Sequence, residues 1–399
     1  MITFKEAYAK VLEHTVDYGT EQVSLKDAVG RVLAVDVKSD RDFPPFNRAT
    51  KDGIALSFSA IKNGQDSFKI EAVIPAGNPT IELKETTSCV EIMTGAVVPN
   101  STDVVVMYED ISIENGIAKL QKVPTQGQNI HLKGSDEVKG AVVLHKNTLI
   151  TAAEIGVLSA VGSAEVLVKK LPKITTIATG NELVEVTEVP LPHQIRKSNI
   201  NSLCAALLEE HIVAKSLHLK DSKEAIKEAL EVALQNNDVL LLSGGVSKGK
   251  FDFLPVVLEE LGVEKVFHKV LQRPGKPFWF GIHKKTNTVI FSFPGNPAST
   301  FANYHIYFKD WLTESLELPV TANLVVLNEN VENKGTLTLF LRVKITFENG
   351  KLIANRIKEN GSGDLTSLAN CDGFIKVAPN QNTYLKGDTI PFIKTRRVL

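Results

Sequence analysis

The 399-residue sequence has only three cysteines, Cys89, Cys204 and Cys371, and they lie far apart. Their spacing matches neither a disulfide framework nor a set of zinc ligands. The nine histidines form no His-x-x-x-His pair or comparable ligand set, so we expect no transition metal held by protein side chains. Such a chain suits a reducing compartment, and we predict a cytoplasmic protein.

The sequence also lacks long apolar runs and a strong charge of either sign. No run approaches the length of a membrane span, and Met1–Lys10 resembles an amphipathic helix, not a signal peptide. The net charge is −1, and no basic stripe with interleaved aromatic residues occurs. We therefore expect neither a membrane nor a nucleic acid as a partner. The length allows roughly two to four domains.

The pattern of short strands and helices predicts an α/β multidomain protein. Residues 1–51 and 131–172 are expected to form a helical or mixed linker domain, with residues 1–35 mostly helical. Residues 52–130 read as an inserted β-rich domain, in which Asn115-Gly116 marks a hairpin. Residues 319–399 are β-rich again and predict a small C-terminal β-barrel.

Residues 173–318 alternate between strand-like and helix-like segments. This alternation predicts a central, mostly parallel α/β/α sheet domain with helices on both faces. In such sheets, ligands bind beyond the carboxyl ends of the strands. Four loops are expected to meet at that edge: Thr179–Glu182, Ser243–Asp252, Arg273–Lys276 and Pro294–Asn296. The acid Asp221 is expected there as well.

The loop that follows the apolar run Val239–Leu242 is the strongest local signal. Ser243, Gly244 and Gly245 let backbone N–H groups approach a ligand, and Ser247 prolongs the polar stretch. A helix pattern then begins near Asp252. A strand, a glycine-rich loop and a helix start together predict a cradle for a phosphate or nucleotide. The alternative is a turn that serves packing only.

Two further loops of this kind follow, at residues 273–277 and 294–297. Arg273-Pro-Gly-Lys276-Pro lies between two strand-like runs, and Pro294-Gly-Asn296-Pro297 follows another. Asn296 is expected to cap a helix whose first residue is Pro297. Ordinary turn punctuation is the alternative for each loop. Three such loops, two of them with cations, favour an anion site.

The same sheet edge should carry both acids and cations. Glu182, Asp221 and Asp252 are candidate Mg²⁺ ligands, because this ion prefers carboxylate oxygens beside phosphates. Arg273 and Lys276 are candidate anion ligands. Structural alternatives stay open: Asp221 stands three residues before Glu224 and could be a helix N-cap, and Asp252 could be another.

These segments resemble the motifs of the MoeA family of molybdopterin molybdenumtransferases, to which the E domain of gephyrin is also similar. The resemblance covers almost the whole chain, and its motifs follow one another in the family's order. The segments that carry it are Lys51–Ala55, Thr94–Ala96 with Pro99, Asp103–Val106 with Glu109, Gly134–Asp136, Thr179–Leu183, Ser243–Gly249 with Asp252, Pro274–Pro277, Pro294–Pro297 and Asn360–Ser362.

The resemblance implies an enzyme that inserts molybdenum from molybdate into molybdopterin adenylate, with Mg²⁺ as cofactor and with release of AMP. It also implies a homodimer, with a molybdopterin adenylyltransferase and acceptor molybdoenzymes as further partners. Catalytic roles are implied for Asp52, Glu182, Asp221, Asp252 and Lys276, with Glu182, Asp221 and Asp252 as metal ligands. Binding roles are implied for Thr94, Thr179, Gly180, Ser243, Gly244, Gly245, Ser247, Arg273, Pro294, Asn296, Ser299, Arg342 and Ser362. Asp52 and Thr94 are expected to serve the site of the partner subunit.

The sequence departs from the family pattern at five positions. Arg273 replaces a usual Lys, Asn181 an Asp, His131 an Arg, Ala49 a Ser and Ile54 a Tyr. Two other functions are alternatives. A molybdopterin adenylyltransferase of the MogA type has about half this length and lacks the flanking β domains. A gephyrin-like scaffold would have no need of Asp221, Asp252 and Lys276.

Overall fold

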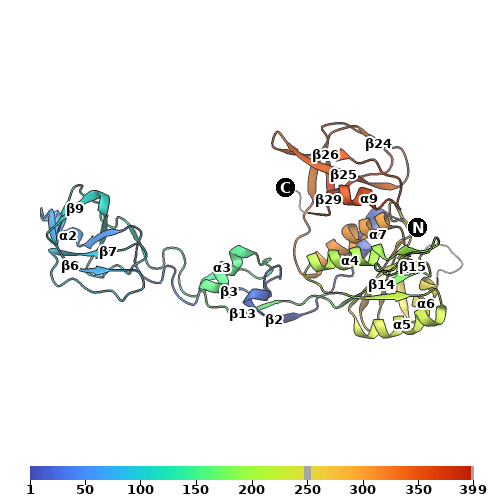
Figure 1. Ribbon diagram of the computed structural model, residues 1–399, viewed down its shortest axis with the longest axis horizontal. Coiled ribbons are helices and arrows are strands. Elements are labelled where there is room, and N and C mark those ends of the chain that lie inside the picture. The colour runs from blue at the N-terminus through green and yellow to red at the C-terminus, as the bar shows by residue number, and fades with distance from the viewer. Residues whose placement is uncertain (247–252, 397–399) are drawn as a thin grey trace. The chain divides into compact units, whose positions relative to one another are not determined.

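The computed structural model describes residues 1–246 and 253–396, apart from the side chains of residues 381 and 382. Its contacts divide the chain into two compact units. The first unit comprises Met1–Gln22, Gly30–Val32 and Leu167–Leu399, and the second comprises Val23–Val29 and Leu33–Val166. Figure 1 shows the elements of both units. The domain boundaries expected from the sequence are finer than this division and stay predictions.

The second unit contains a six-stranded sheet in the order β8-β5-β7-β6-β10-β9. Its strands are β5 (Gly53–Leu56), β6 (Ser67–Ile74), β7 (Ser88–Ile92), β8 (Val104–Met107), β9 (Ile111–Glu114) and β10 (Ile117–Leu120). The hairpin expected at Asn115-Gly116 is confirmed, since β9 and β10 pair antiparallel and both turn residues have positive φ, 48° and 75°. Apolar residues from alternating positions of the strands fill its core.

Shorter elements complete the second unit. Strand β4 (Arg48–Ala49) pairs with β11 (Ile130–His131), and β3 (Val37–Lys38) pairs with β12 (Val142–Leu144). The helices are α2 (Phe58–Lys62), α3 (Ala152–Ala160) and the 3₁₀ turns η1 (Leu25–Asp27) and η2 (Tyr108–Asp110). Strands β2 (Thr20–Ser24) and β13 (Glu165–Lys169) pair with each other, and each has residues in both units.

The first unit is built on a six-stranded sheet in the order β17-β14-β18-β22-β21-β19. Its strands are β14 (Ile174–Thr179), β17 (Lys215–Leu219), β18 (Val239–Ser243), β19 (Val263–His268), β21 (Trp279–His283) and β22 (Thr288–Phe293). The first four in spatial order run parallel, β21 runs antiparallel to β22, and β19 is antiparallel to β21, so it has the direction of the first four. The parallel strands bring the ends of β14, β17, β18 and β22 to one edge, as the alternation of elements predicts.

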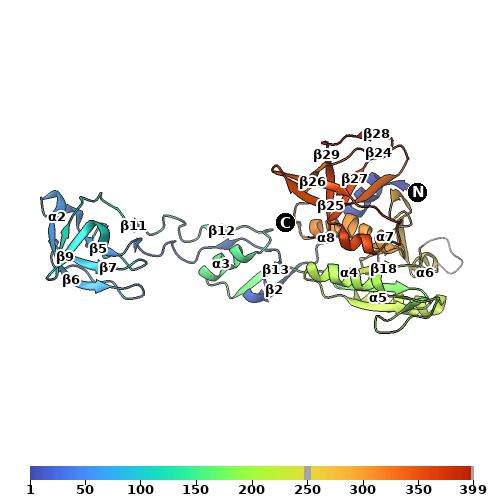
Figure 2. The ribbon, with the colours of Figure 1, turned by 45° about the horizontal axis from the view of Figure 1, so that its top comes forward.

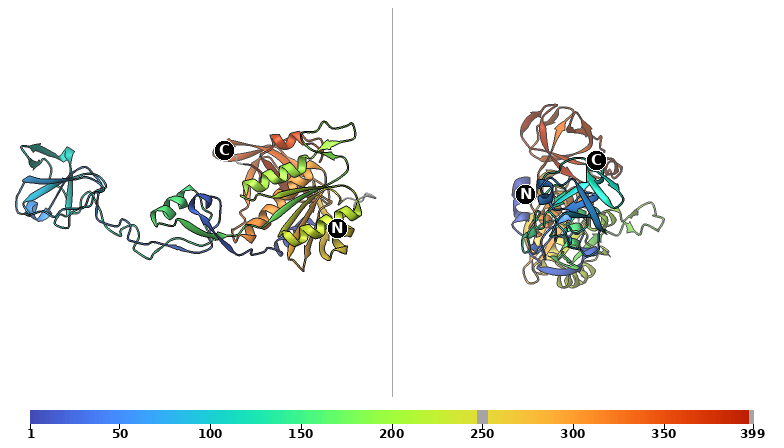
Figure 3. Two further views of the ribbon diagram at one scale, coloured as in Figure 1. Left: turned by 60° about the horizontal axis from the view of Figure 1, so that its bottom comes forward. Right: turned by 90° about the vertical axis from the view of Figure 1, so that its left-hand side faces the viewer.

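Helices cover both faces of this sheet because the strand residues are apolar on both sides. Val239 and Leu241 belong to one core cluster, and Leu240 and Leu242 belong to the other. Figures 1 and 3 show α4 and α7 on one face and α5 and α6 on the opposite face. The helices of this α/β domain are α4 (Ser198–Glu209), α5 (Lys223–Asn236), α6 (Leu254–Glu260), α7 (Pro297–Asn303), the π-helix η3 (Tyr304–Phe308) and α8 (Lys309–Ser315).

The C-terminal strands form a separate closed ring. Strands β25, β26, β23, β29 and β27 pair in that order, and β27 pairs back with β25, so a five-stranded barrel closes (Figure 2). Their bounds are β23 (Asn323–Leu327), β25 (Thr338–Glu348), β26 (Lys351–Arg356), β27 (Gly373–Val377) and β29 (Thr389–Lys394). Strands β24 (Val331–Asn333) and β28 (Gln381–Tyr384) form a separate pair. Helix α9 (Thr366–Asn370) precedes β27 in the chain. Strand β20 (Val270–Arg273) joins β25 to β1 (Ile2–Thr3), and β15 (Leu183–Val184) pairs with β16 (Ile195–Arg196).

The expectation that residues 1–35 are mostly helical is wrong beyond the first turns. Helix α1 (Phe4–Leu12) has a capping box formed by Thr3 and Glu6, and its apolar residues Ala7 and Val11 enter the core of the first unit. The chain then continues without helix to strand β2.

Candidate functional site

The Ser-Gly-Gly loop begins where β18 ends and lies against the end of β14. The N–H of Gly244 donates to the carbonyl of Phe293 at 3.1 Å, which holds the loop to strand β22. A Cβ atom at Gly244 would stand 2.8 Å from the carbonyl oxygen of Thr179, and its φ is +98°, so only glycine fits. The buried hydroxyl of Thr179 has no hydrogen-bond partner among the described residues. An unpaired buried hydroxyl beside a glycine loop is consistent with a ligand group at this edge.

Asn199 near the start of α4 joins this loop to the Pro-Gly-Asn-Pro loop. Its side-chain amide donates to the Ser243 hydroxyl at 2.9 Å and to the Gly295 carbonyl at 2.6 Å. The hydroxyl of Thr300 lies 3.4 Å from the same nitrogen and donates to the Pro294 carbonyl at 2.5 Å. The two loops are therefore fixed against each other by side chains from α4 and α7.

Asp221 follows β17 and pairs with the loop after β14. The N–H of Asn181 donates to the Asp221 carboxylate at 3.2 Å, and the N–H of Asp221 donates to the Asn181 side-chain oxygen at 3.2 Å. The N-cap of α5 is Ser222, whose hydroxyl accepts from the N–H of Ala225. The alternative of Asp221 as the cap is thus excluded, and its carboxylate points to the neighbouring loop. Glu182 is the next residue of that loop and is exposed.

The third expected acid cannot be placed, because Asp252 and Ser247 lie outside the described residues. Within residues 1–246 and 253–396, no group of three or more His, Cys, Asp or Glu side chains is arranged to hold a metal ion. Glu182 and Asp221 nevertheless fit Mg²⁺, which is commonly bound through one or two carboxylates, with waters and substrate phosphates supplying the other oxygens.

Two exposed cations flank a glycine in the loop after β20. Arg273 and Lys276 are both exposed, and no ion pair of either appears in the described part of the chain. The N–H of Gly275 between them donates to the hydroxyl of Ser299 on α7 at 3.2 Å. The side-chain oxygen of Asn303, the last residue of α7, accepts from the Gln272 side chain at 2.9 Å and supports the same loop. The loop is anchored by neutral groups, which leaves both cationic side chains available to an anion.

Asn296 links the end of the sheet to the C-terminal segment. It occupies the N-cap position of α7, with Pro297 as the first helical residue, as the sequence predicts. Its side chain makes no capping bond, and its amide instead donates to the Ser362 hydroxyl at 2.9 Å. The N–H of Ala298 donates to the Ser362 carbonyl at 3.0 Å. Ser362 is thus brought to the sheet edge although it lies far along the chain.

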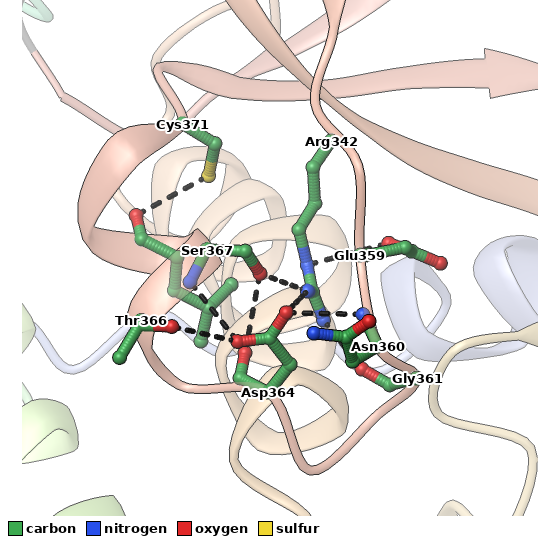
Figure 4. Close-up of polar contacts among 9 residues, drawn as sticks. Arg342, Glu359, Asn360, Gly361, Asp364, Thr366, Ser367 and Cys371 are labelled. Carbon is green, nitrogen blue, oxygen red and sulfur yellow. Dashed lines mark hydrogen bonds and ion pairs between the residues drawn. The ribbon is translucent and has the colours of Figure 1, made fainter.

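Arg342 on β25 fixes the loop that carries Ser362, and Figure 4 shows its partners. Its side chain is 1% exposed. One terminal nitrogen donates to the Ser367 hydroxyl and the other to the Gly361 carbonyl at 3.2 Å, while Nε lies 3.5 Å from the Glu359 carboxylate. The structure therefore surrounds this guanidinium with protein groups. Its expected contact with molybdate stays a prediction.

Asp364 closes the same loop. Its carboxylate accepts N–H groups of Asn360 and Ser367, at 3.0 and 3.2 Å (Figure 4). These bonds favour the charged form, and they lower the pKa of Asp364 to about 2. The loop therefore keeps its negative anchor over the whole physiological pH range.

Asp52 and Thr94, the two site residues expected from the second unit, are brought together there. The Asp52 carboxylate accepts the N–H of Thr94 at 2.6 Å, and this bond lowers the pKa of Asp52. Both residues are exposed. The pair is a small polar patch with one charged carboxylate at neutral pH.

His131 makes two contacts in the second unit. Its Nδ1 lies 3.2 Å from the Arg48 guanidinium, and its Nε2 lies 2.8 Å from the Asp136 carboxylate. Because arginine can only donate, Nδ1 accepts and the neutral ring carries its proton on Nε2. A histidine at this position thus still connects a cation and an acid.

Comparison with known proteins bears on the whole chain. Residues 2–162 match the MoeA N-terminal region (domain I and II), residues 175–314 a probable molybdopterin binding domain, and residues 325–395 the MoeA C-terminal region (domain IV). A protein of Synechocystis sp. named molybdopterin molybdenumtransferase is 37% identical over 398 residues, which are 98% of this chain and 99% of that protein. The chain belongs to the MoeA family.

Other MoeA relatives support the same assignment. A Bacillus subtilis protein named molybdopterin molybdenumtransferase is 31% identical, over 99% of this chain and 94% of that protein. The crystal structure of the molybdopterin biosynthesis MoeA protein from Pyrococcus horikosii superposes with a TM-score of 0.83 at 29% identity, over 99% of both chains. The mixed α/β multidomain fold is therefore the MoeA fold.

Several residues that organise this MoeA site were not predicted from the sequence. Asn199 and Thr300 join the loops, Gln272 and Asn303 support the Arg273–Lys276 loop, and Ser367 and Asp364 hold the C-terminal loop. Five of them bear no charge and Asp364 is a single acid in a polar loop, so no local signal separates them from surface residues. The Asn199 side chain follows Ser198 at a helix start, a pair that reads as a capping segment.

Proposed function

We propose that this chain is a molybdopterin molybdenumtransferase, which inserts molybdenum from molybdate into molybdopterin adenylate and releases AMP in an Mg²⁺-dependent reaction. The observation that carries the proposal is the continuous set of contacts at the carboxyl edge of the sheet. Asn199 joins the Ser243 loop to Gly295, and Asn296 joins that loop to Ser362. One edge thus combines a glycine cradle, two acids and two cations without ion-pair partners among the described residues.

The acids and the glycine loop are suited to the nucleotide part of the substrate. Glu182 and Asp221, together with Asp252, would hold Mg²⁺, which would neutralise phosphate charge as the AMP group leaves. The backbone around Gly180, Gly244 and Gly245 and the hydroxyls of Thr179 and Ser243 would position the adenylate. Ser247 would extend this cradle. Positioning of two anions close together is the main contribution that these groups can make.

The second half of the site suits molybdate. Arg273 and Lys276 are cations and Ser299 and Ser362 are hydroxyl donors, which are the groups that bind a small oxyanion. Pro294 and Asn296 hold the loop between the two halves. Arg342 would act on molybdate directly or through the Ser362 loop, and its enclosed guanidinium favours the second route.

The proposal extends to the quaternary structure and the cellular setting. We propose a homodimer in which the Asp52–Thr94 pair serves the site of the partner subunit, and a cytoplasmic location. Among the described helices, none is long and apolar enough to cross a membrane. A molybdopterin adenylyltransferase would supply the substrate, and acceptor molybdoenzymes would receive the product. The proposed domain limits are residues 1–51 with 131–172, 52–130, 173–318 and 319–399.

The test is to incubate the purified protein with molybdopterin adenylate, molybdate and Mg²⁺ and to follow AMP by chromatography. We expect AMP release to require both molybdate and the divalent metal. Full AMP release in excess chelator would contradict the metal requirement. The absence of any molybdate-dependent AMP release under saturating Mg²⁺ would contradict the proposed function itself.

A further inference from the structure

The side chain of His218 in strand β17 contacts the loop that carries Asn181 and Glu182. Its Nε2 lies 2.8 Å from the carbonyl oxygen of Gly180. A carbonyl can only accept, so Nε2 carries the proton and donates. His218 is partly buried at the end of the strand, one residue before Leu219, whose carbonyl accepts the N–H of Gly180 at 3.3 Å.

The peptide between Gly180 and Asn181 is thereby held at both ends. Its carbonyl accepts from His218, and its N–H donates to the carboxylate of Asp221 at 3.2 Å. The plane of this peptide decides which of the two groups faces Asp221. If it turned over, the carbonyl oxygen would face a carboxylate instead of the amide hydrogen, which is electrostatically unfavourable.

Gly180 is the residue at which such a rotation costs least. Its φ is +141°, a region that residues with a side chain rarely adopt, and glycine moves between such regions with little steric cost. The donor of His218 and the carboxylate of Asp221 thus favour the same orientation of this peptide. Without it, the Gly180 carbonyl loses its partner at this edge of the sheet.

The carboxylate of Glu182 lies next to the same peptide. A Cβ atom built at Gly180 would lie 2.5 Å from one carboxylate oxygen of Glu182 and 2.7 Å from the other, so this carboxylate folds back over the glycine. Asp221 is bound to one side of the peptide and Glu182 lies over its glycine. Both candidate metal acids are therefore next to a single peptide group, whose orientation His218 influences.

We propose that His218 is a positioning residue for the divalent metal: by holding the Gly180 carbonyl, it fixes Glu182 and Asp221 in the arrangement that binds Mg²⁺. This inference rests on the Mg²⁺ dependence of the proposed function. Groups that orient metal ligands without touching the metal commonly contribute about tenfold or more to metal affinity. In this role His218 acts through the backbone carbonyl of Gly180.

The test compares two variants, His218→Gln and His218→Asn, whose side-chain amides differ only in the length of the chain that carries them. In His218→Gln, the side-chain nitrogen occupies the place of Nε2 and can donate to Gly180. In His218→Asn, it is one bond too short. The probe is Mn²⁺, which binds oxygen ligands as Mg²⁺ does and is followed by electron paramagnetic resonance without substrate. We expect His218→Asn to weaken Mn²⁺ binding about tenfold or more, and His218→Gln to stay close to the wild type.

A second readout separates positioning from chemistry. His218→Asn should raise the Mg²⁺ concentration needed for half-maximal AMP release, while the rate at saturating Mg²⁺ stays near that of the wild type. The matched control is His283→Asn, because His283 lies in the same sheet but bonds Thr286, beside the start of β22, at 2.6 Å. It should leave Mn²⁺ affinity unchanged.

The outcomes distinguish the inference from the proposed function. Wild-type Mn²⁺ affinity in a folded His218→Asn protein, or an equal loss in His218→Gln, would overturn the role of His218. Failure of the wild-type protein to bind Mn²⁺ would overturn it as well. A wild-type protein that binds Mn²⁺ with the expected ranking of variants but releases no AMP would support the role of His218 and contradict the proposed reaction.

Discussion

The side-chain amide of Asn199 donates a 2.9 Å hydrogen bond to the hydroxyl of Ser243. The same nitrogen reaches the Gly295 carbonyl at 2.6 Å. One helix residue thus connects two loops that follow different strands of the sheet. Each loop alone is a common turn, and the connection between them makes a single binding edge from two separate segments.

The first prediction concerns this connection. Asn199→Ala removes both bonds, so the loops lose their fixed spacing and we expect kcat/KM for molybdopterin adenylate to fall at least about tenfold, or ~1.4 kcal/mol of transition-state stabilisation. Steady-state AMP release measures this change. The matched control is Asn201→Ala on the same helix, whose amide donates to the Lys197 carbonyl at 2.7 Å and whose loss should not alter the kinetics. Unchanged kinetics in Asn199→Ala would show that the loops keep their spacing by other means.

The second prediction separates a metal ligand from a helix cap. Ser222→Ala removes the cap of α5 and should lower stability by about 0.5–1 kcal/mol while the rate of AMP release stays near that of the wild type. Asp221→Ala should instead lower the rate at least about tenfold with a smaller effect on stability. Thermal unfolding and AMP release, measured on both variants, decide the matter. A wild-type rate in a folded Asp221→Ala protein would rule out a metal role.

The pair Asp221 and Ser222 also shows how far the sequence could predict this site. The sequence allows a capping role for Asp221, but the structure gives the cap of α5 to Ser222 and sets Asp221 against Asn181. The loops after the strands could be predicted because strand runs and glycine turns are local patterns. Contacts such as Asn199 with Gly295 depend on tertiary packing, which no local pattern records.

The prediction of helix throughout residues 1–35 was wrong for a related reason. The apolar spacing of Phe4 to Leu12 fits a helix, and the expectation of more helix up to residue 35 extended that pattern too far. Residues Thr20–Ser24 form a strand because they pair with Glu165–Lys169, a partner about 140 positions away in the chain. Closure of the C-terminal barrel by β25 and β27 is a similar long-range pairing, although its strand-rich pattern was predictable.

The third prediction concerns the buried Arg342. Arg342→Lys replaces a planar fork by a single ammonium, which cannot reach Ser367 and the Gly361 carbonyl together. We expect a lower thermal midpoint together with a higher KM for molybdate, because the Ser362 loop loses its anchor. The control Arg356→Lys alters an exposed arginine, 3.8 Å from Glu329, and should change neither quantity. A raised KM at an unchanged midpoint would indicate instead that the guanidinium contacts molybdate directly.

The fourth prediction tests the shared site of the proposed homodimer. Asp52→Ala and Asp221→Ala should each be inactive alone. After subunit exchange, about half of the dimers are mixed and each keeps one intact site, so about a quarter of wild-type activity should return. AMP release is measured before and after mixing, and exchange is verified with two different affinity tags. No recovery despite complete exchange would place Asp52 and Asp221 in the site of the same subunit or show that Asp52 has no role there.

The fifth prediction concerns pH and stability. His305 in η3 is buried, and neither ring nitrogen has a partner among the described residues. Burial, with a smaller contribution from Lys309, lowers the pKa of His305 to about 3. The unfolded chain takes up a proton near pH 6.5 but the folded protein does not, so stability is complete above pH 6.5 and falls as pH drops toward 3, by up to about 1.4 kcal/mol per pH unit.

His305→Phe keeps the ring packing against Phe301, 4.5 Å away between centroids, and removes this cost. We expect similar urea midpoints at pH 7 and a clearly higher midpoint than the wild type at pH 5. The control His145→Phe changes a side chain that is 79% exposed and should retain the wild-type pH dependence. Equal losses between pH 7 and pH 5 in His305→Phe and the wild type would show that other groups, not this imidazole, govern acid stability.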